Sequence, residues 1–293
     1  GVASTAALQI FNYDDYLNNH QSDATFTYAS KNPGTWANTL KVCSIDDFAD
    51  QRIGISTNNL ALAGATVGFA VTANIDGAII PGIGTTGGFT GFLKAIITGV
   101  STDSTNSNST IDVKITDRMS VIGGITSYFP IDYAEGNSIA AFTSSSSIQF
   151  LNNSGVTTGH SADAAYTPAS VVDWYDQQTL DLKNATTFWK SLAPRPTTSN
   201  FVKTRKGKND GIHVVVVDDE GRITGIKGNI IETHLNLSKA NDAVSAVNAP
   251  QKVYYKDYIA DFSQNIYAGI NPSNAKDTNW GTNPRASGFS TSC

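Results

Sequence analysis

The sequence predicts a β-rich α+β protein with mixed or antiparallel sheets and few short helices, and three observations lead to this class. Charged residues make up 15% of the 293 residues, against roughly 25% in an average globular chain. Ser, Thr, Asn and Gly fill the other polar positions, and these residues suit turns better than helix interiors. Several segments alternate polar and apolar residues or consist of β-branched residues, as strands do.

The N-terminal half is predicted to consist of strands joined by turns. Residues 32–38 carry turn residues, and residues 39–45 alternate like a half-buried strand. Between residues 61 and 100, small residues and glycines favour short strands joined by glycine turns over helices. Residues 101–110 are nearly all Ser, Thr, Asn and Asp, so we expect an exposed loop before a strand at 111–116.

A hairpin and a helix are predicted next. Apolar residues at 148, 150 and 151 interrupt a polar stretch over residues 143–160, which suggests a hairpin with long connections. The helix candidate has Thr167 as its N-cap and Pro168 at its first position. We expect it to run for about three turns and to end before Leu182.

The most regular pattern is a β-branched run over residues 212–217. It predicts a buried strand that enters a tight hairpin at an acidic turn, with Gly221 at positive φ. Residues 222–226 are expected to return as a strand, and residues 229–237 alternate again.

These patterns divide the chain into three parts. Residues 1–30 are expected to be a connecting segment, and residues 31–266 to form the β-rich body. An inserted subdomain at about 51–160 is one option within this body. Past Tyr267 the sequence turns to Asn, Ser, Pro and Gly without a period, so residues 267–293 are expected to be a linker.

Composition argues against two classes of partner. The formal net charge of -5 provides no global basic field for nucleic acid. The longest apolar run, residues 212–217, is far shorter than the ~20 residues of a membrane helix. Two cysteines are too few for a disulfide framework. We therefore expect neither a nucleic-acid partner nor a membrane span.

No residue pattern predicts a catalytic, cofactor-binding or metal-binding site. The acids at 218–220 could bind calcium or act as an acid/base pair, but a turn needs the same residues and is the favoured interpretation. The four histidines, His20, His160, His213 and His234, have no second ligand at zinc spacing. Packing or hydrogen bonding within strands is therefore favoured for the last two.

Lys203, Arg205, Lys206 and Lys208 form the one basic cluster of the sequence. A solvated loop is the favoured interpretation, because no aromatic residues interleave with the cluster as base stacking would require. The alternative is a subunit-contact loop that forms salt bridges with an acidic neighbouring subunit.

The composition also allows two functions outside structural assembly. The aromatic residues could furnish the sugar platform of a carbohydrate-binding or adhesion β-domain of a virion protein, although buried aromatics are the simpler interpretation. The candidates are the eleven tyrosines together with the four tryptophans, Trp36, Trp174, Trp189 and Trp280. A hydrolase using Asp218 and Glu220 is disfavoured, because neighbouring turn positions place two carboxylates poorly.

Two stretches carry a family resemblance. Residues 32–42, with Pro33, Gly34 and Asn38, are similar to the Tyr-Pro-Gly, Gly-Asn and strand segment of contractile phage tail sheath proteins, but depart from it at the first position and at Ala37.

The longer match runs from residue 173 to 259 and resembles the tail sheath proteins of T-even-like myoviruses, particularly those of cyanobacterial phages. Its motif residues are Asp173, Trp174, Trp189, Pro194, Arg195, Pro196, Ser199, Asp210, His213, Asp218, Gly221, Gly225, Glu232, Ser238, Tyr254 and Tyr255. The two stretches cover under half of the chain.

The resemblance implies a structural subunit of a contractile bacteriophage tail sheath in the virion, assembled in the bacterial host cytoplasm, with no enzymatic activity and no cofactor. Sheath subunits stack around the tail tube, and contraction drives the tube through the host envelope during genome ejection. The implied partners are other copies of the chain in a helical homopolymer, together with tail tube and baseplate proteins.

Two family features are absent from the sequence: the N-terminal Pro-Gly-Val arm, and the C-terminal domain whose last strand links subunits. The chain therefore resembles the outer, protease-resistant part of a sheath subunit. We expect the tube and baseplate contacts to lie in missing parts, and we expect that the chain does not polymerise alone.

Overall fold

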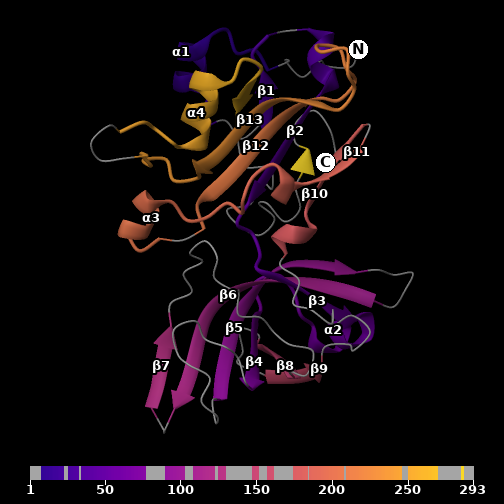
Figure 1. The fold of residues 1–293 in the computed structure, drawn as a ribbon, viewed down its shortest axis with the longest axis vertical. Helices are drawn as coiled ribbons and strands as arrows, with labels where there is room; N and C mark the ends of the chain where they lie inside the picture. Colours follow the sequence, from indigo (N-terminus) through magenta and orange to yellow (C-terminus); the bar gives the residue numbers. More distant parts are fainter. Residues whose placement is uncertain are drawn as a thin grey trace, which may run out of the picture. The chain divides into compact units, whose positions relative to one another are not determined.

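The computed structural model describes residues 8–22, 26–32, 34–76, 90–102, 108–122, 125–129, 147–151, 157–161, 174–183, 185–207, 209–245, 250–269 and 285–286. They belong to two compact units (Figure 1). Unit 1 comprises Gly1–Asp47 and Thr179–Cys293, and unit 2 comprises Phe48–Gln178. The described part of the chain is β-rich, its strand pairs are antiparallel and its helices are short, in agreement with the predicted class.

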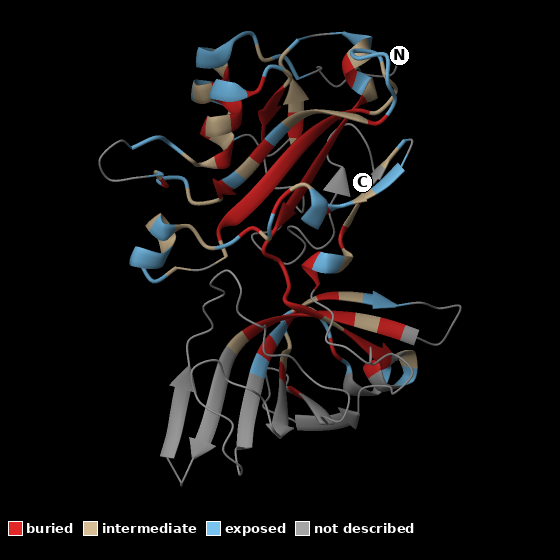
Figure 2. Cartoon of the chain, in the orientation of Figure 1, coloured by how far each residue is buried: buried red, intermediate tan, exposed pale blue. Residues whose placement is uncertain are grey.

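Unit 1 is built on a four-stranded antiparallel sheet with the strand order β13-β12-β2-β15 (Figure 1). The strands are β2 (Leu40–Asp46), β12 (Gly211–Asp218), β13 (Asn229–Ser238) and β15 (Arg285–Ala286). Every residue of β2 and β12 is buried (Figure 2). Burial on both faces explains why β12 is a continuous β-branched run, because no position faces water.

The strands predicted at 39–45 and 212–217 are confirmed, with one correction. The alternation in β2 predicts a half-buried strand, yet all of its residues are buried. Its charged side chains reach partners inside unit 1: Lys41 Nζ lies 3.2 Å from Asp219 Oδ1, and Asp46 pairs with Lys239. Pairing makes the burial of alternate polar side chains tolerable.

A helical layer and a two-stranded sheet cover one part of the four-stranded sheet. β1 (Tyr28–Ser30) pairs with β14 (Ile266–Ala268), and α4 (Tyr255–Phe262) lies against them. α1 (Tyr13–Asp15) continues into a π-helical turn at Tyr16–His20. The apolar core that joins these elements to the sheet consists of Tyr28, Leu40, Val42, Ile212, Val214, Val216, Leu237, Tyr255, Ile259, Ile266 and Ala268.

Unit 2 is a seven-stranded antiparallel sheet with the order β3-β6-β5-β4-β8-β9, in which β7 also pairs with β6. Its elements are β3 (Gln51–Ser56), α2 (Thr57–Ala63), β4 (Ala70–Asp76), β5 (Thr90–Thr102), β6 (Asn108–Ile122), β7 (Ile125–Phe129), β8 (Ser147–Leu151) and β9 (Thr157–Ser161). The predicted strand at 111–116 lies within β6, and β8 and β9 form the hairpin predicted at 143–160. The core includes Val71, Ile97, Ile111, Val113 and Phe150.

Two predictions for unit 2 need correction. The region from residue 61, predicted to be strands and turns, begins with the end of α2. The exposed loop predicted at 101–110 is shorter, because β5 extends to Thr102 and β6 begins at Asn108. Within that range Ser109 is buried, and residues 103–107 lie outside the described residues. Strand pairing has overridden the turn preference of these polar residues.

Only the end of the helix predicted from Thr167 can be compared, because residues 167–173 lie outside the described residues, and there the structure has a 3-10 turn in place of an α-helix. A 3-10 turn at Tyr175–Gln177 leads into β10 (Thr179–Leu182), which pairs with β11 (Ala185–Phe188). Gln178 Nε2 donates a hydrogen bond to the Trp174 carbonyl oxygen, and this bond closes the turn. The chain leaves helical geometry at Gln178, so the predicted end before Leu182 is confirmed.

The tight hairpin predicted after β12 is also wrong, although Gly221 has the predicted positive φ, at 70°. Residues 222–226 do not return as a strand; β13 begins only at Asn229. The backbone amides that would pair across a hairpin are bound by the Asp218 carboxylate instead.

No helix in the described part of the chain has the length and apolar character that crossing a bilayer requires.

Ile259→Ala is expected to lower the free energy of unfolding of unit 1 by about 2–5 kcal/mol, because truncating a fully buried side chain leaves a cavity. Ile226→Ala, at a side chain that is 61% exposed, is the matched control and should change it by less than about 0.5 kcal/mol. Denaturant unfolding of the full chain measures both. Equal effects would contradict the packing of α4 on the sheet.

Candidate functional site

The motif residues of the family resemblance lie mostly in unit 1, around the ends of β12 and β13. Pro33 and Asp173 lie outside the described residues, and Trp174 belongs to unit 2. The others occupy the turn before β2, the segment between β11 and β12, the two long strands and the start of α4. Their hydrogen bonds centre on three carboxylates and one histidine.

Asp210 joins three segments at the start of β12. Its Oδ1 accepts a hydrogen bond from the Ser199 backbone N–H at 2.8 Å, and its Oδ2 accepts one from the Ser238 hydroxyl. Ser199 is in turn the N-cap of α3 (Asn200–Thr204), where its hydroxyl accepts from Val202 N–H. One buried carboxylate therefore fixes the end of β13 and the start of α3 against β12.

His213 is fully buried and acts as a neutral connector. Its Nε2 donates to the Pro194 carbonyl oxygen at 2.8 Å, and its Nδ1 accepts from Asn236 N–H at 3.0 Å. The pairing of β12 with β13 is irregular between Ile212 and Val214. The Asn236 N–H lies at this irregularity and donates its hydrogen bond to His213 Nδ1 instead of to a strand carbonyl oxygen. Burial lowers the pKa of His213, so the imidazole stays uncharged at neutral pH.

Asp218 organises the loop that joins β12 to β13. Its carboxylate accepts hydrogen bonds from the N–H groups of Arg222, Ile223 and Thr224 and from the Thr224 hydroxyl, at 2.7–2.9 Å. Burial alone would raise the pKa of Asp218, but these donors lower it. A Cβ on Gly221 would lie 2.9 Å from Lys227 N, so the loop requires glycine there.

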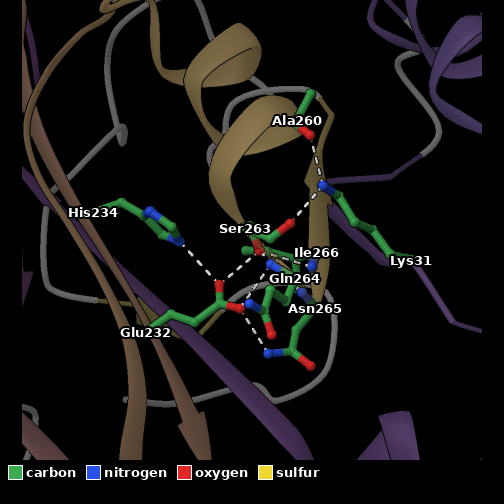
Figure 3. Close-up of polar contacts among 8 residues, drawn as sticks. All are labelled: Lys31, Glu232, His234, Ala260, Ser263, Gln264, Asn265 and Ile266. Carbon is green, nitrogen blue, oxygen red and sulfur yellow. Dashed lines mark hydrogen bonds and ion pairs between the residues drawn. The ribbon is translucent and has the colours of Figure 1, made fainter.

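Glu232 holds the turn that follows α4 (Figure 3). Its Oε2 accepts hydrogen bonds from His234 Nε2 at 2.9 Å and the Ser263 hydroxyl at 2.6 Å. Its Oε1 accepts from Gln264 N–H at 2.9 Å and Asn265 Nδ2 at 2.7 Å. Burial acts to raise the pKa of Glu232, but the four donors outweigh it and lower the pKa to about 2.

Lys31 holds the same end of α4 from the other side (Figure 3). Its Nζ donates to the Ala260 and Ser263 carbonyl oxygens, both at 2.6 Å, and lies 4.7 Å from the centre of the Tyr267 ring. A cation at a helix C-terminus binds carbonyl groups that have no partner within the helix. Glu232 and Lys31 together fix α4 between β13 and the chain before β2.

The remaining motif residues pack or form ion pairs. Trp189 and Tyr255 are buried, and Arg195 Nη1 lies 3.8 Å from Asp47 Oδ1. The rings of Tyr254 and Tyr255 meet edge to face at 5.3 Å. Gly34 and Asn38 lie at the 3-10 turn before β2, Pro196 is buried before α3, and Gly225 has a φ of 80° in the β12–β13 loop.

The basic cluster lies on the surface at the end of α3, where Lys203, Arg205 and Lys206 are exposed, while Lys208 lies outside the described residues. The Arg205 guanidinium stacks 3.5 Å from the centre of the Phe201 ring and donates to its carbonyl oxygen. Such stacking partly occupies the positive charge of Arg205.

The three motif carboxylates bind groups of their own chain. Asp210, Asp218 and Glu232 each accept several hydrogen bonds from their own chain. Within the described ranges, no three His, Cys, Asp or Glu side chains are grouped to hold a metal ion. Trp174 and Trp189 are fully buried and offer no face to a ligand. Trp280 lies outside the described residues.

The sequence predicted that His234 packs or forms hydrogen bonds within its strand, but it did not name Glu232 as the partner, and it missed the role of Lys31. The first had a signal, because residues i and i+2 of a strand share a face. The second had none, because Lys31 and Ser263 are far apart in the sequence and meet only after folding.

Glu232→Gln is expected to lower the free energy of unfolding at pH 7 by about 1.5–3 kcal/mol, the usual worth of a hydrogen bond to a charged group. The folded-state pKa of about 2 lies below the ordinary value of 4.5, so the stabilisation is present above pH 4.5 and is lost as the pH falls toward 2. The difference between wild type and Glu232→Gln should therefore shrink over that window. Urea unfolding at a series of pH values measures it.

Glu220→Gln is the matched control for this experiment. Its carboxylate is partly exposed and pairs with Lys183 and Lys227 at the surface, so Glu220→Gln should lower the free energy of unfolding far less than Glu232→Gln does. A pH-independent difference for Glu232→Gln would contradict the assigned network.

Asp218→Ala is expected to speed amide hydrogen exchange at Arg222, Ile223 and Thr224, because their acceptor is removed. Amides of β12 in the same sample serve as the internal control and should keep their protection. Unchanged exchange in the loop would show that Asp218 does not hold it.

Comparisons with family models, curated proteins and solved structures found no match. The resemblance to tail sheath proteins therefore rests on the motif residues and their spacing. To that resemblance the structure adds what the motif acids do: Asp210, Asp218 and Glu232 each connect separate segments of unit 1.

Proposed function

We propose that the chain is a structural subunit of a contractile phage tail sheath and that it works through contacts with other copies of itself rather than through catalysis. The observation that carries the proposal is that the motif acids form their hydrogen bonds within the chain. Asp210, Asp218 and Glu232 have their oxygens bound by N–H and O–H groups of the same chain. Acids bound in this way stabilise a fold and are poorly placed to transfer protons to a substrate.

A contracting sheath moves its subunits as rigid bodies between two packings, so each subunit must keep its internal structure while its contacts change. Unit 1 suits that requirement. Its central strands are fully buried, and its connections are fixed by the Asp210, Asp218 and Glu232 networks.

The adhesion alternative draws no support from the tryptophans that the structure describes. A sugar platform needs an exposed aromatic face, but Trp174 and Trp189 are fully buried and Trp36 is partly buried.

Immunogold electron microscopy of particles that contain this polypeptide tests the proposal. Antibodies raised against the surface segment 200–207, in which residues 203–206 are exposed, should label tails along their whole length, in both the extended and the contracted state. Preincubation with the same peptide is the control and should remove the label. Label confined to heads or fibres, together with binding of the purified chain to a glycan panel, would replace the proposal with the adhesion function.

A further inference from the structure

Among the side chains that the structure describes, most of the large exposed hydrophobic ones belong to unit 1. Within the described residues there are eight such side chains, and seven of them lie in unit 1. Six of the seven form two groups, one on the β12–β13 loop and one around α1 and the end of α4. The eight are Leu8, Phe11, Tyr13, Ile96, Phe188, Ile223, Ile226 and Phe262.

The first group, here named the basic apolar loop, consists of Lys183, Arg222, Ile223, Ile226 and Lys227. Residues 222–227 are all exposed, and the two isoleucines are 46% and 61% exposed. Lys183 and Lys227 lie 2.7 and 3.5 Å from the Glu220 carboxylate. The charged side chains that are exposed at the tip, Lys183, Arg222 and Lys227, are all basic. The acids of the same segment are less exposed: Asp218 is buried, Asp219 pairs with Lys41, and Glu220 pairs with Lys183 and Lys227.

Hydrogen bonds within the chain fix the conformation of the basic apolar loop in the absence of a partner. The four hydrogen bonds to Asp218 fix its first half, and Gly228 N–H donates to the Asp218 carbonyl oxygen at 2.9 Å to close it. A preorganised loop loses little conformational entropy on binding, which favours a role in recognition.

The second group, here named the acidic aromatic patch, consists of Leu8, Phe11, Tyr13, Asp14, Asp261 and Phe262. The Tyr13 hydroxyl donates to Asp261 Oδ1 at 2.6 Å and joins the N-terminal segment to the end of α4. All six residues are exposed, and Phe11 is 78% exposed.

The cations nearest to this patch do not cancel its charge at the surface. Lys31 Nζ is bound to two carbonyl groups at the end of α4, and Lys256 Nζ is bound to the Gln21 carbonyl oxygen. Both side chains are partly buried. The exposed charges beside the aromatic rings are therefore Asp14 and Asp261.

We propose that the basic apolar loop of one copy docks on the acidic aromatic patch of another. Both surfaces expose large apolar side chains, and their exposed charges are opposite: basic on the loop and acidic on the patch. Apolar contact would provide affinity, and the opposite charges would orient the two copies. In Figure 1 the β12–β13 connection and the α1–α4 layer lie on different sides of unit 1, so one copy cannot satisfy both surfaces by itself.

Such a contact is heterologous: each copy uses one surface to receive a neighbour and the other to enter the next. It can therefore repeat without closing, as a helical array requires. The inference rests on the proposed function only in taking the partner to be another copy of this chain.

A complementation experiment with the full chain tests the docking. A loop variant, Ile223→Asp with Ile226→Asp, and a patch variant, Asp14→Lys with Phe262→Lys, each lose one surface and keep the other. At low salt and rising concentration, wild type should form weak oligomers in sedimentation velocity, and each variant alone should stay monomeric. An equimolar mixture should form a one-to-one complex that grows no further, because only one productive pairing exists.

Lys94→Glu with Lys190→Glu, at two exposed positions outside both surfaces, is the charge control and should associate as wild type does. Circular dichroism and thermal unfolding establish that each variant is folded. A monomeric wild type at low salt, a mixture that stays monomeric, or a patch variant that still dimerises alone would overturn the docking. Labelled tails together with any of these results would leave the sheath function standing and reject this contact alone.

Discussion

The burial of β12 on both faces and along both edges is the constraint on which the rest of unit 1 depends. A buried strand must find a partner for every backbone N–H and C=O group. β2 and β13 supply those partners along its length. Where the ladders end, Asp210 and Asp218 bind the adjoining segments, so α3 and the β12–β13 loop are placed by the two ends of one strand.

Asp210, Asp218 and Glu232 have the same structural role at three places in unit 1. Each accepts N–H and O–H groups that irregular backbone cannot pair within itself, and each joins segments that are separated in the sequence. The helix α4 shows the result best. Glu232 of β13 binds the turn that follows the helix, and Lys31, just after β1, binds the carbonyl oxygens of Ala260 and Ser263. The two opposite charges form strong hydrogen bonds with polar groups at the end of α4 and so help to hold the helix in position.

How much of this fold could be predicted depends on how local its causes are. β12 was predictable because burial on both faces produces an unbroken apolar run, and the hairpin of β8 and β9 was predictable from apolar residues within a polar stretch. The loop after β12 was not, because Ile223 and Ile226 resemble a returning strand while the Asp218 carboxylate binds the backbone. Among the candidate site residues, the buried roles of His213 and His234 followed from their strands, but the partners of Glu232 beyond His234 come from distant segments.

Unit 1 is interrupted by the whole of unit 2, and this fixes an order of events during synthesis. β2 leaves the ribosome before unit 2 is made, and it must wait for β12 before its sheet can form. Closing a long unfolded connection between these strands costs chain entropy. Unit 2 is encoded without interruption and can fold first, and the hydrogen bond from Trp174 N–H to the Asp50 carbonyl oxygen brings its two ends together. Once unit 2 has folded, the long flexible connection between β2 and β12 becomes a short one. Less chain entropy is then lost when the two strands pair.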